Sequence, residues 1–301
     1  MGVAVSMLLI RGTFKVSGGS RPDGDTLPFI PDNVADWKLV PGCKQILPGA
    51  DGRAPVRLEA VDALETHYGI DDQEQHQPLK FAHRAADELL TWLGFTHIQR
   101  HDDETVTTVP ERVPGYILTR GTDVHGRCVA LVGRRVPPAY SGYWIDVDEK
   151  QLTRTANHHL VASGLAYPTF YTGLPGFIRG ALSTAAQAAR AASTPEKRGL
   201  WAEDVTLTGA KITGMPSLTG RNGAVILPKL FRRLKDYLDL YPADSSPSLA
   251  CFPAFLAGAG DTYSIPQRPK PITGLQHIVE ISDGHTVRMT HHPEEIVFAE
   301  K

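Results

Sequence analysis

The chain has 301 residues, of which 42% are hydrophobic and 21% are charged, and its formal net charge is −2. These values predict a globular protein with a real core and exclude a global cationic field, so any contact with nucleic acid must come from a local basic patch. The length favours one large or two modest domains. No stretch approaches the roughly 20 apolar residues that span a bilayer, so we expect no membrane partner.

The cysteine usage and the N-terminus predict a cellular location. Cys43, Cys128 and Cys251 are far apart, odd in number and without the CxxC spacing of a metal site. This pattern argues against a disulfide framework and predicts a reducing, cytoplasmic location. Residues 1–10 are apolar, but no basic residue precedes Arg11, which argues against a signal peptide.

Alternating and apolar runs predict five strands in the first half of the chain. They are expected over residues 7–16, 25–30, 56–61, 115–120 and 127–133. Residues 31–55 are rich in Pro, Gly and Asp and predict an extended insertion with room for one hairpin.

Helical spacing of apolar residues predicts three helices among and after these strands. They are expected over residues 78–93, 149–163 and 175–193. Gly94 is a suitable stop for the first, and Asp148 with Gln151 three residues later predicts a capping box at the start of the second. Strands with interspersed helices favour an α+β fold, a small twisted barrel with helices packed against it.

The composition changes after Asp204, so we expect a main domain over residues 1–204 and a small α+β extension over residues 205–301, with no motif that reveals its role. Its segments are a Gly- and Thr-rich loop, an amphipathic helix, an aperiodic stretch and a hairpin, over residues 205–223, 227–241, 242–272 and 277–298. The hairpin is expected to turn at Asp283-Gly284. The basic residues Arg232, Arg233 and Lys235 are expected on the solvent face of the helix.

Three short segments carry acids and arginines suited to metal-assisted phosphodiester chemistry. They are Asp23-Gly24-Asp25-Thr26, residues 56–65 (VRLEAVDALE) and residues 123–127 (DVHGR). Carboxylates hold hard divalent cations or take a proton from water, and guanidinium groups stabilise the charge that builds on phosphorus. Taken alone, each segment also has an ordinary interpretation, as a turn with solvated acids, a solvated strand end or an exposed loop arginine.

The spacing within the second segment sets a condition. Arg57 and Asp62 are five positions apart, and strand alternation places such residues on opposite faces. They can share a face only if the chain bends near Ala60 or Asp62. Glu65 follows Asp62 by three residues, which is one-turn spacing.

In this order the segments resemble the staphylococcal-nuclease-like (thermonuclease) family, over about residues 7–204. The family pattern is DGDT, then R-x-x-x-x-D-x-x-E, then T-D-x-x-G-R. It is met by residues 23–26, by Arg57, Asp62 and Glu65, and by Thr122-Asp123 with Gly126-Arg127. Gly164-Leu165-Ala166 and residues 200–204 (LWAED) also look like late segments of the family.

The resemblance implies a five-stranded OB-type β-barrel with packed helices and a calcium site. Asp25 and Asp62 would carry over as calcium ligands. The threonine-proline that usually follows the second aspartate is Ala63-Leu64 here, and Ala63 can supply the same backbone carbonyl.

The resemblance also implies a nuclease that hydrolyses DNA, with RNA as a second candidate substrate. Glu65 would be the general base or would orient the attacking water, while Arg57 and Arg127 would bind the phosphate and stabilise the transition state. Val124 and His125 replace a lysine and a tyrosine that help to hold the nucleotide in the family, which bears on nucleotide affinity. The alternative is a non-catalytic OB-type module that binds nucleic acid or protein.

Overall fold

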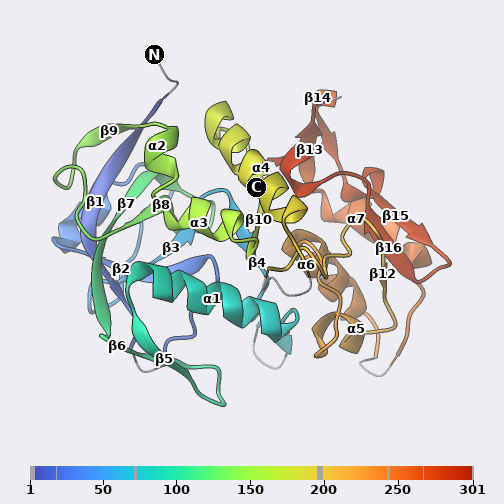
Figure 1. Cartoon of the computed structure of the whole chain (residues 1–301). Helices are drawn as coiled ribbons and strands as arrows, with labels where there is room; N and C mark the ends of the chain where they lie inside the picture. The colour runs from blue at the N-terminus through green and yellow to red at the C-terminus, as the bar shows by residue number, and fades with distance from the viewer. Residues whose placement is uncertain are drawn as a thin grey trace.

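A computed structural model describes residues 4–17, 19–70, 73–194, 199–242, 245–266 and 268–299. Five strands close into a barrel and a further strand is hydrogen-bonded outside it (Figure 1). The barrel strands are β1 (Val5–Lys15), β2 (Thr26–Pro31), β3 (Ala54–Leu58), β7 (Arg112–Thr122) and β8 (Cys128–Arg134), and the outer strand is β9 (Trp144–Val147).

The order around the barrel is β1-β2-β3-β8-β7, and β7 returns to β1. β3 and β8 run parallel, while the other barrel pairs are antiparallel. This α+β arrangement is consistent with an OB-type barrel and confirms the predicted fold class. Each of the five predicted strands corresponds to a barrel strand, although the third ends at Leu58 instead of continuing to residue 61.

The barrel interior explains why these segments form strands. Alternate residues point inward and are fully buried, among them Phe14 on β1, Phe29 on β2 and Val56 on β3. The rings of Phe14 and Phe29 pack at 5.0 Å between centroids. Because a shift of one residue would turn every apolar side chain outward, this packing fixes the register in which the site residues leave the barrel.

The predicted helices are present, with one break. They are α1 (Leu79–Leu93), α2 (Glu149–Leu152), α3 (Ala156–Ala162) and α4 (Gly176–Ala191). Gly94 ends α1 in a left-handed conformation, and Asp148 with Gln151 forms the predicted capping box. The single helix expected over residues 149–163 is wrong, because the Thr155 side chain accepts a hydrogen bond from the His158 N–H and begins a new helix.

The insertion at residues 31–55 differs from the expectation of a hairpin. Residues 32–53, which are described throughout, contain the 3-10 helix η1 (Val34–Leu39) and no strand. The Asn33 side chain accepts from the Ala35 N–H at 3.1 Å and begins this helix. Trp37 of this helix is buried and donates its indole N–H to the Gly52 carbonyl at 3.0 Å. Its ring lies 5.9 Å from that of Phe29, so the insertion packs against the barrel.

Short strands connect the barrel to the rest of the chain. They are β4 (Val61–Ala63), β5 (Thr96–Arg100), β6 (Val106–Val109), β10 (Ala166–Pro168) and β11 (Phe170–Tyr171). β5 pairs with β6, β4 pairs with β10, and β11 pairs in parallel with β17 (Val297–Phe298) near the C-terminus. Through this pairing, residues 297–298 return to the middle of the protein.

The C-terminal region contains the predicted helix and hairpin and further elements that the sequence did not predict. The predicted ones are α6 (Pro228–Leu238) and the pair β15 (Val279–Ser282) and β16 (Thr286–Met289). The others are β12 (Ala210–Lys211), α5 (Pro216–Thr219), η3 (Leu249–Cys251), α7 (Phe252–Ala259), β13 (Thr262–Ile265), β14 (Arg268–Thr273), η4 (Leu275–His277) and η5 (Pro293–Glu295).

The two parts of the chain lie side by side, with the barrel and α1 on one side and α5 to α7 on the other (Figure 1). The Gln77 side chain crosses between them and donates to the Ile226 carbonyl at 2.8 Å. The boundary at residue 204 stays a prediction. Among the helices in the described ranges, none combines the length and the apolar character needed to cross a bilayer.

Candidate active site

A bend in the chain joins the two halves of the second motif. β3 ends at Leu58, and Ala60 adopts a left-handed conformation with φ of 62° before β4 begins at Val61. The bend brings Nη2 of Arg57 within 2.8 Å of Oδ1 of Asp62. Arg57 and Asp62 could share a face only if the chain bent near Ala60 or Asp62, and the bend lies at Ala60.

Asn157 of α3 holds this bend in place. Its side-chain oxygen accepts from the Val132 N–H at 2.9 Å, and its amide group donates to the carbonyls of Glu59 at 2.8 Å and Ala130 at 3.1 Å. The side chain is fully buried, so these backbone groups have no water to replace it. Asn157 thus fixes the turn that follows Arg57 against β8, and sequence patterns gave no signal of this role.

Asp25 connects the start of β2 to β4. Its Oδ2 accepts from the Ala63 N–H at 2.8 Å, its Oδ1 accepts from the Thr26 hydroxyl at 3.1 Å, and it forms an ion pair with Arg57. Ala63, which was predicted to offer a carbonyl, thus contacts Asp25 through its N–H. The Asp25 side chain is 7% exposed, so the ion pair is largely shielded from water.

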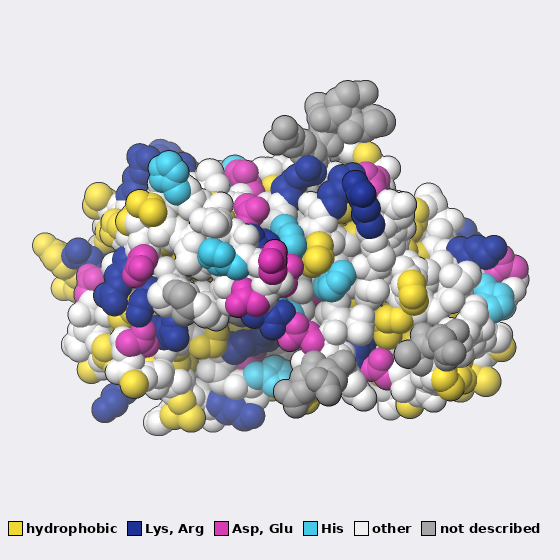
Figure 2. All heavy atoms as spheres, turned by 90° about the horizontal axis from the view of Figure 1, so that it is seen from below, with side chains coloured by type: hydrophobic (Ala, Val, Ile, Leu, Met, Phe, Trp, Pro, Cys, Tyr) yellow, Lys and Arg dark blue, Asp and Glu magenta, His cyan; other side chains and the backbone are white. Residues whose placement is uncertain are grey.

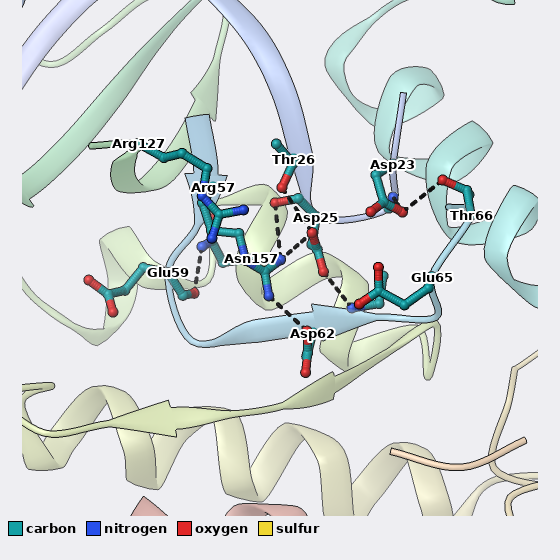
Figure 3. A network of polar contacts seen from close by, with 12 residues as sticks. Asp23, Asp25, Thr26, Arg57, Glu59, Asp62, Glu65, Thr66, Arg127 and Asn157 are labelled. Atoms are coloured by element: carbon teal, nitrogen blue, oxygen red, sulfur yellow. Dashed lines mark hydrogen bonds and ion pairs between the residues drawn. The ribbon is translucent and has the colours of Figure 1, made fainter. Parts of the chain in front are cut away.

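The Arg57 guanidinium lies between two carboxylates. Figure 3 shows its side chain with those of Asp25 and Asp62 where β2, β3 and β4 meet, while Glu59 points away. Burial would lower the pKa of Arg57, but Asp25 and Asp62 raise it above its ordinary value. Burial would raise the pKa of Asp62, but Arg232 and Arg57 hold it below its usual value. This pair is therefore charged.

Glu65 and Asp23 have raised pKa values, in contrast to the lowered pKa of Asp62. Burial raises the pKa of Glu65 to about 7, with contributions from the nearby Asp62 and Asp25. Burial, Asp25 and Glu65 also raise the pKa of Asp23 well above its usual value. A carboxyl whose pKa lies near neutral pH can accept and release a proton during turnover, so Glu65 has the property that a general base needs.

The third motif forms a tight loop around Asp123. Its Oδ1 accepts from the backbone N–H groups of His125 and Arg127, both at 2.9 Å, and its Oδ2 accepts from Nε of Arg127 at 2.8 Å. Gly126 occupies a left-handed turn position with φ of 82°. Asp123 therefore orients the Arg127 guanidinium, whose side chain is 39% exposed and whose Nη atoms have no partner among the described residues.

The three motifs meet at one open cleft of 1230 Å³. Asp25, Arg57, Glu65 and Arg127 all line it. Further basic side chains line the same cleft, namely Arg21, Arg53, Lys229, Arg232 and Arg233. Seen from below, basic, acidic and histidine side chains gather over the middle of the protein around a hollow (Figure 2). Acidic side chains also line the cleft, namely Asp23, Asp25, Glu65 and Asp236, and most of its arginines are paired with carboxylates, so the cleft carries charges of both signs.

Arg232 is a site residue that sequence reasoning placed wrongly. Arg232, Arg233 and Lys235 were expected on the solvent face of the C-terminal helix, yet their side chains are only 22%, 22% and 5% exposed. Nη2 of Arg232 lies 3.0 Å from Oδ2 of Asp62, and its Nη1 forms an ion pair with Glu65. Asp62 and Glu65 are therefore bound to a helix about 170 residues away in sequence.

The arrangement of these oxygens decides whether a cation fits. Asp62 accepts from Arg57 and Arg232, and Asp25 is bonded to Arg57 and to the Ala63 N–H. Within the described part of the chain, no three His, Cys, Asp or Glu side chains are grouped to hold a metal ion. The donor chemistry suits calcium, but guanidinium groups occupy the oxygens, so a divalent cation does not fit among these side chains as they are arranged.

Comparison with known proteins adds no family to this description. No protein-family model matches the chain, and no curated protein sequence is significantly similar to it.

Proposed function

We propose that the protein is a nuclease that hydrolyses phosphodiester bonds of DNA, with RNA as a second candidate substrate. The observation that supports this proposal most strongly is that Asp25, Arg57, Glu65 and Arg127, which come from three separate motifs, line one arginine-rich cleft. Arginines bind phosphate through paired N–H groups, and a carboxyl with a pKa of about 7 suits the activation of water.

In the proposed reaction, Arg127 presents its Nη atoms to a phosphate oxygen while Asp123 holds its Nε. Arg57 lies deeper in the cleft and stabilises the charge that builds on phosphorus. Glu65 takes the proton from the attacking water as the water oxygen bonds to phosphorus. The P–O bond to the leaving sugar oxygen then breaks, and that oxygen takes a proton from solvent. The resemblance implies calcium dependence, which the side chains as arranged do not favour, so the calcium and chelator arms of the experiment below decide it. No step is assigned to the ion, because the carboxylates are already occupied.

The second candidate is a non-catalytic module that binds nucleic acid or protein. The observation that favours it is the contact of Arg232 with both Asp62 and Glu65, which neutralises the acids that hydrolysis would use. Both the nuclease and the binding module would use the same arginine-rich cleft. The test that separates them is therefore whether the nucleic acid is cleaved, not whether it is bound.

The decisive experiment incubates labelled DNA and RNA, single- and double-stranded, with the protein in calcium and in chelator. Glu65→Gln, Arg57→Ala and Arg127→Ala should each lower the cleavage rate at least about 100-fold. Arg288→Ala is the control, since Arg288 forms an exposed pair with Glu280 in the C-terminal hairpin. Cleavage that survives both Glu65→Gln and Arg57→Ala unchanged contradicts the site, and a gel shift without cleavage supports the binding module.

A further inference from the structure

We propose that Arg232 is the built-in cation of the acid cluster and excludes a divalent cation from Asp62 and Glu65. The C-terminal helix α6 would then decide whether this site binds metal, which gives the region a role that no motif in it reveals. The inference concerns cation binding alone and holds whether or not the protein cleaves nucleic acid.

The first support is the contact itself. Arg232 meets Asp62 with both Nη atoms, at 3.0 and 3.5 Å, and also reaches Glu65 with Nη1. The Asp62 side chain is 1% exposed and that of Glu65 is 11% exposed. One planar group thus satisfies two carboxylates that have little access to water, and a guanidinium suits such buried acceptors better than a hydrated ammonium does.

The second support is the balance of charge. Two cationic side chains, Arg57 and Arg232, contact the acids of this cluster. The acids are Asp23, Asp25, Asp62 and Glu65. Without Arg232 the cluster would keep one guanidinium for four carboxyl groups in a poorly hydrated space. Buried like charges must then be protonated or balanced by another cation, and oxygen-rich clusters balance them with hard divalent cations.

The third support is the way in which α6 is held. Its apolar face is buried through Leu230, Phe231 and Leu234. Arg233, the next residue, pairs with Asp261 of its own region at 2.6 and 2.9 Å. These contacts fix the helix, so Arg232 extends from a rigid base across to β4. Adjacent arginines therefore differ in role: Arg232 contacts the acid cluster, whereas Arg233 helps to hold the helix.

The two cations cannot occupy the acids together. A divalent ion would need the Asp62 oxygens that Arg57 and Arg232 contact, and it would lie within a few ångströms of a like charge. Like charges this close repel strongly inside a protein, so removing Arg232 should strengthen calcium binding at least about 10-fold.

The test measures calcium binding to the full chain by isothermal titration calorimetry. Arg232→Gln should bind calcium at least about 10-fold more tightly than the wild type. Arg288→Gln, which removes the same charge from an exposed pair with Glu280 outside the cleft, should match the wild type. Adding Asp62→Asn to Arg232→Gln should abolish the gain. Equal affinities of Arg232→Gln and the wild type, or a gain that survives Asp62→Asn, would overturn the proposal.

A variant that does not fold without a cation still decides the question. Ligands that bind only the native state raise the unfolding temperature, so calcium should refold or stabilise Arg232→Gln but not the wild type. Circular dichroism during a calcium titration measures this directly. Failure of millimolar calcium to restore the fold of Arg232→Gln would count against the proposal, and nucleic-acid cleavage does not enter either readout.

Discussion

Replacing Arg57 by alanine should destabilise the protein as well as inactivate it. The Arg57 side chain is 16% exposed, and its partners Asp25 and Asp62 are 7% and 1% exposed. Removing one member of a buried ion pair costs about 3–5 kcal/mol, because the remaining charge has neither water nor a partner. Asp62 keeps Arg232, so the loss falls mainly on Asp25 and we expect the lower end of that range, ~3 kcal/mol.

The part of the cost that falls on Asp62 should depend on pH in a defined direction. The pKa of Asp62 lies below its ordinary value of 3.8 in the folded protein, because Arg232 and Arg57 together outweigh its burial. An acid with a lowered pKa stabilises the fold above its unfolded pKa, and this contribution is lost as the pH falls through the folded value. The difference between the wild type and Arg57→Ala should therefore be largest at neutral pH and should shrink below about pH 4.

Urea unfolding followed by circular dichroism at neutral and acidic pH measures both effects. Two other arginines are the controls. Arg53 forms an exposed 3.5 Å contact with Asp51, and Arg127 is 39% exposed, so alanine at either position should cost less than about 1 kcal/mol. If Arg57→Ala also costs less than about 1 kcal/mol at neutral pH, or if its cost grows on acidification, the reasoning about the buried pair is wrong.

Three further predictions test the base, the bend and its support. The cleavage rate should rise with pH up to about 7 and then level off, because burial raises the pKa of Glu65 to about 7. A rate that does not change across neutral pH contradicts the role of Glu65 as base. Asn157→Leu removes the side-chain partner of the buried Val132 N–H and Glu59 carbonyl, while the Ala130 carbonyl keeps its bond from the Glu59 N–H. It should cost ~2–4 kcal/mol in urea unfolding, so a change below ~1 kcal/mol refutes its structural role. Ala60→Val should lower the free energy of unfolding by at least ~1 kcal/mol, because Ala60 has a left-handed backbone conformation. Ala60→Gly should leave that free energy unchanged or raise it. A glycine variant less stable than the valine variant would refute the idea of strain at this bend.

The barrel was predictable because its determinants are local. Strand alternation, turn residues and the stop at Gly94 each act within a few positions, and they placed all five barrel strands and α1. The aperiodic stretch at residues 242–272 was not predictable in the same way. α7 has only eight residues, Phe252–Ala259, with Pro at its start and Gly after its end, so it is too short to show helical periodicity.

The same contrast applies within the site. The positions of Arg57, Asp62 and Glu65 depend on one bend at Ala60, which spacing along the chain could anticipate. The position of Arg232 depends on how α6 packs against β4, about 170 residues away, and helix phase only places it on a polar face.

The polar face of α6 can contact either water or a carboxylate, and the sequence of the helix does not distinguish between these two partners. The available signal lay elsewhere, in the excess of acids over arginines in the first two motifs: Asp23, Asp25, Glu59, Asp62 and Glu65 accompany Arg57 alone. Such an excess requires a further cation if the acids are buried together. The resemblance supplied calcium as that cation, whereas the fold supplies an arginine from the far end of the chain, so cation binding by Arg232→Gln is the measurement that separates the two.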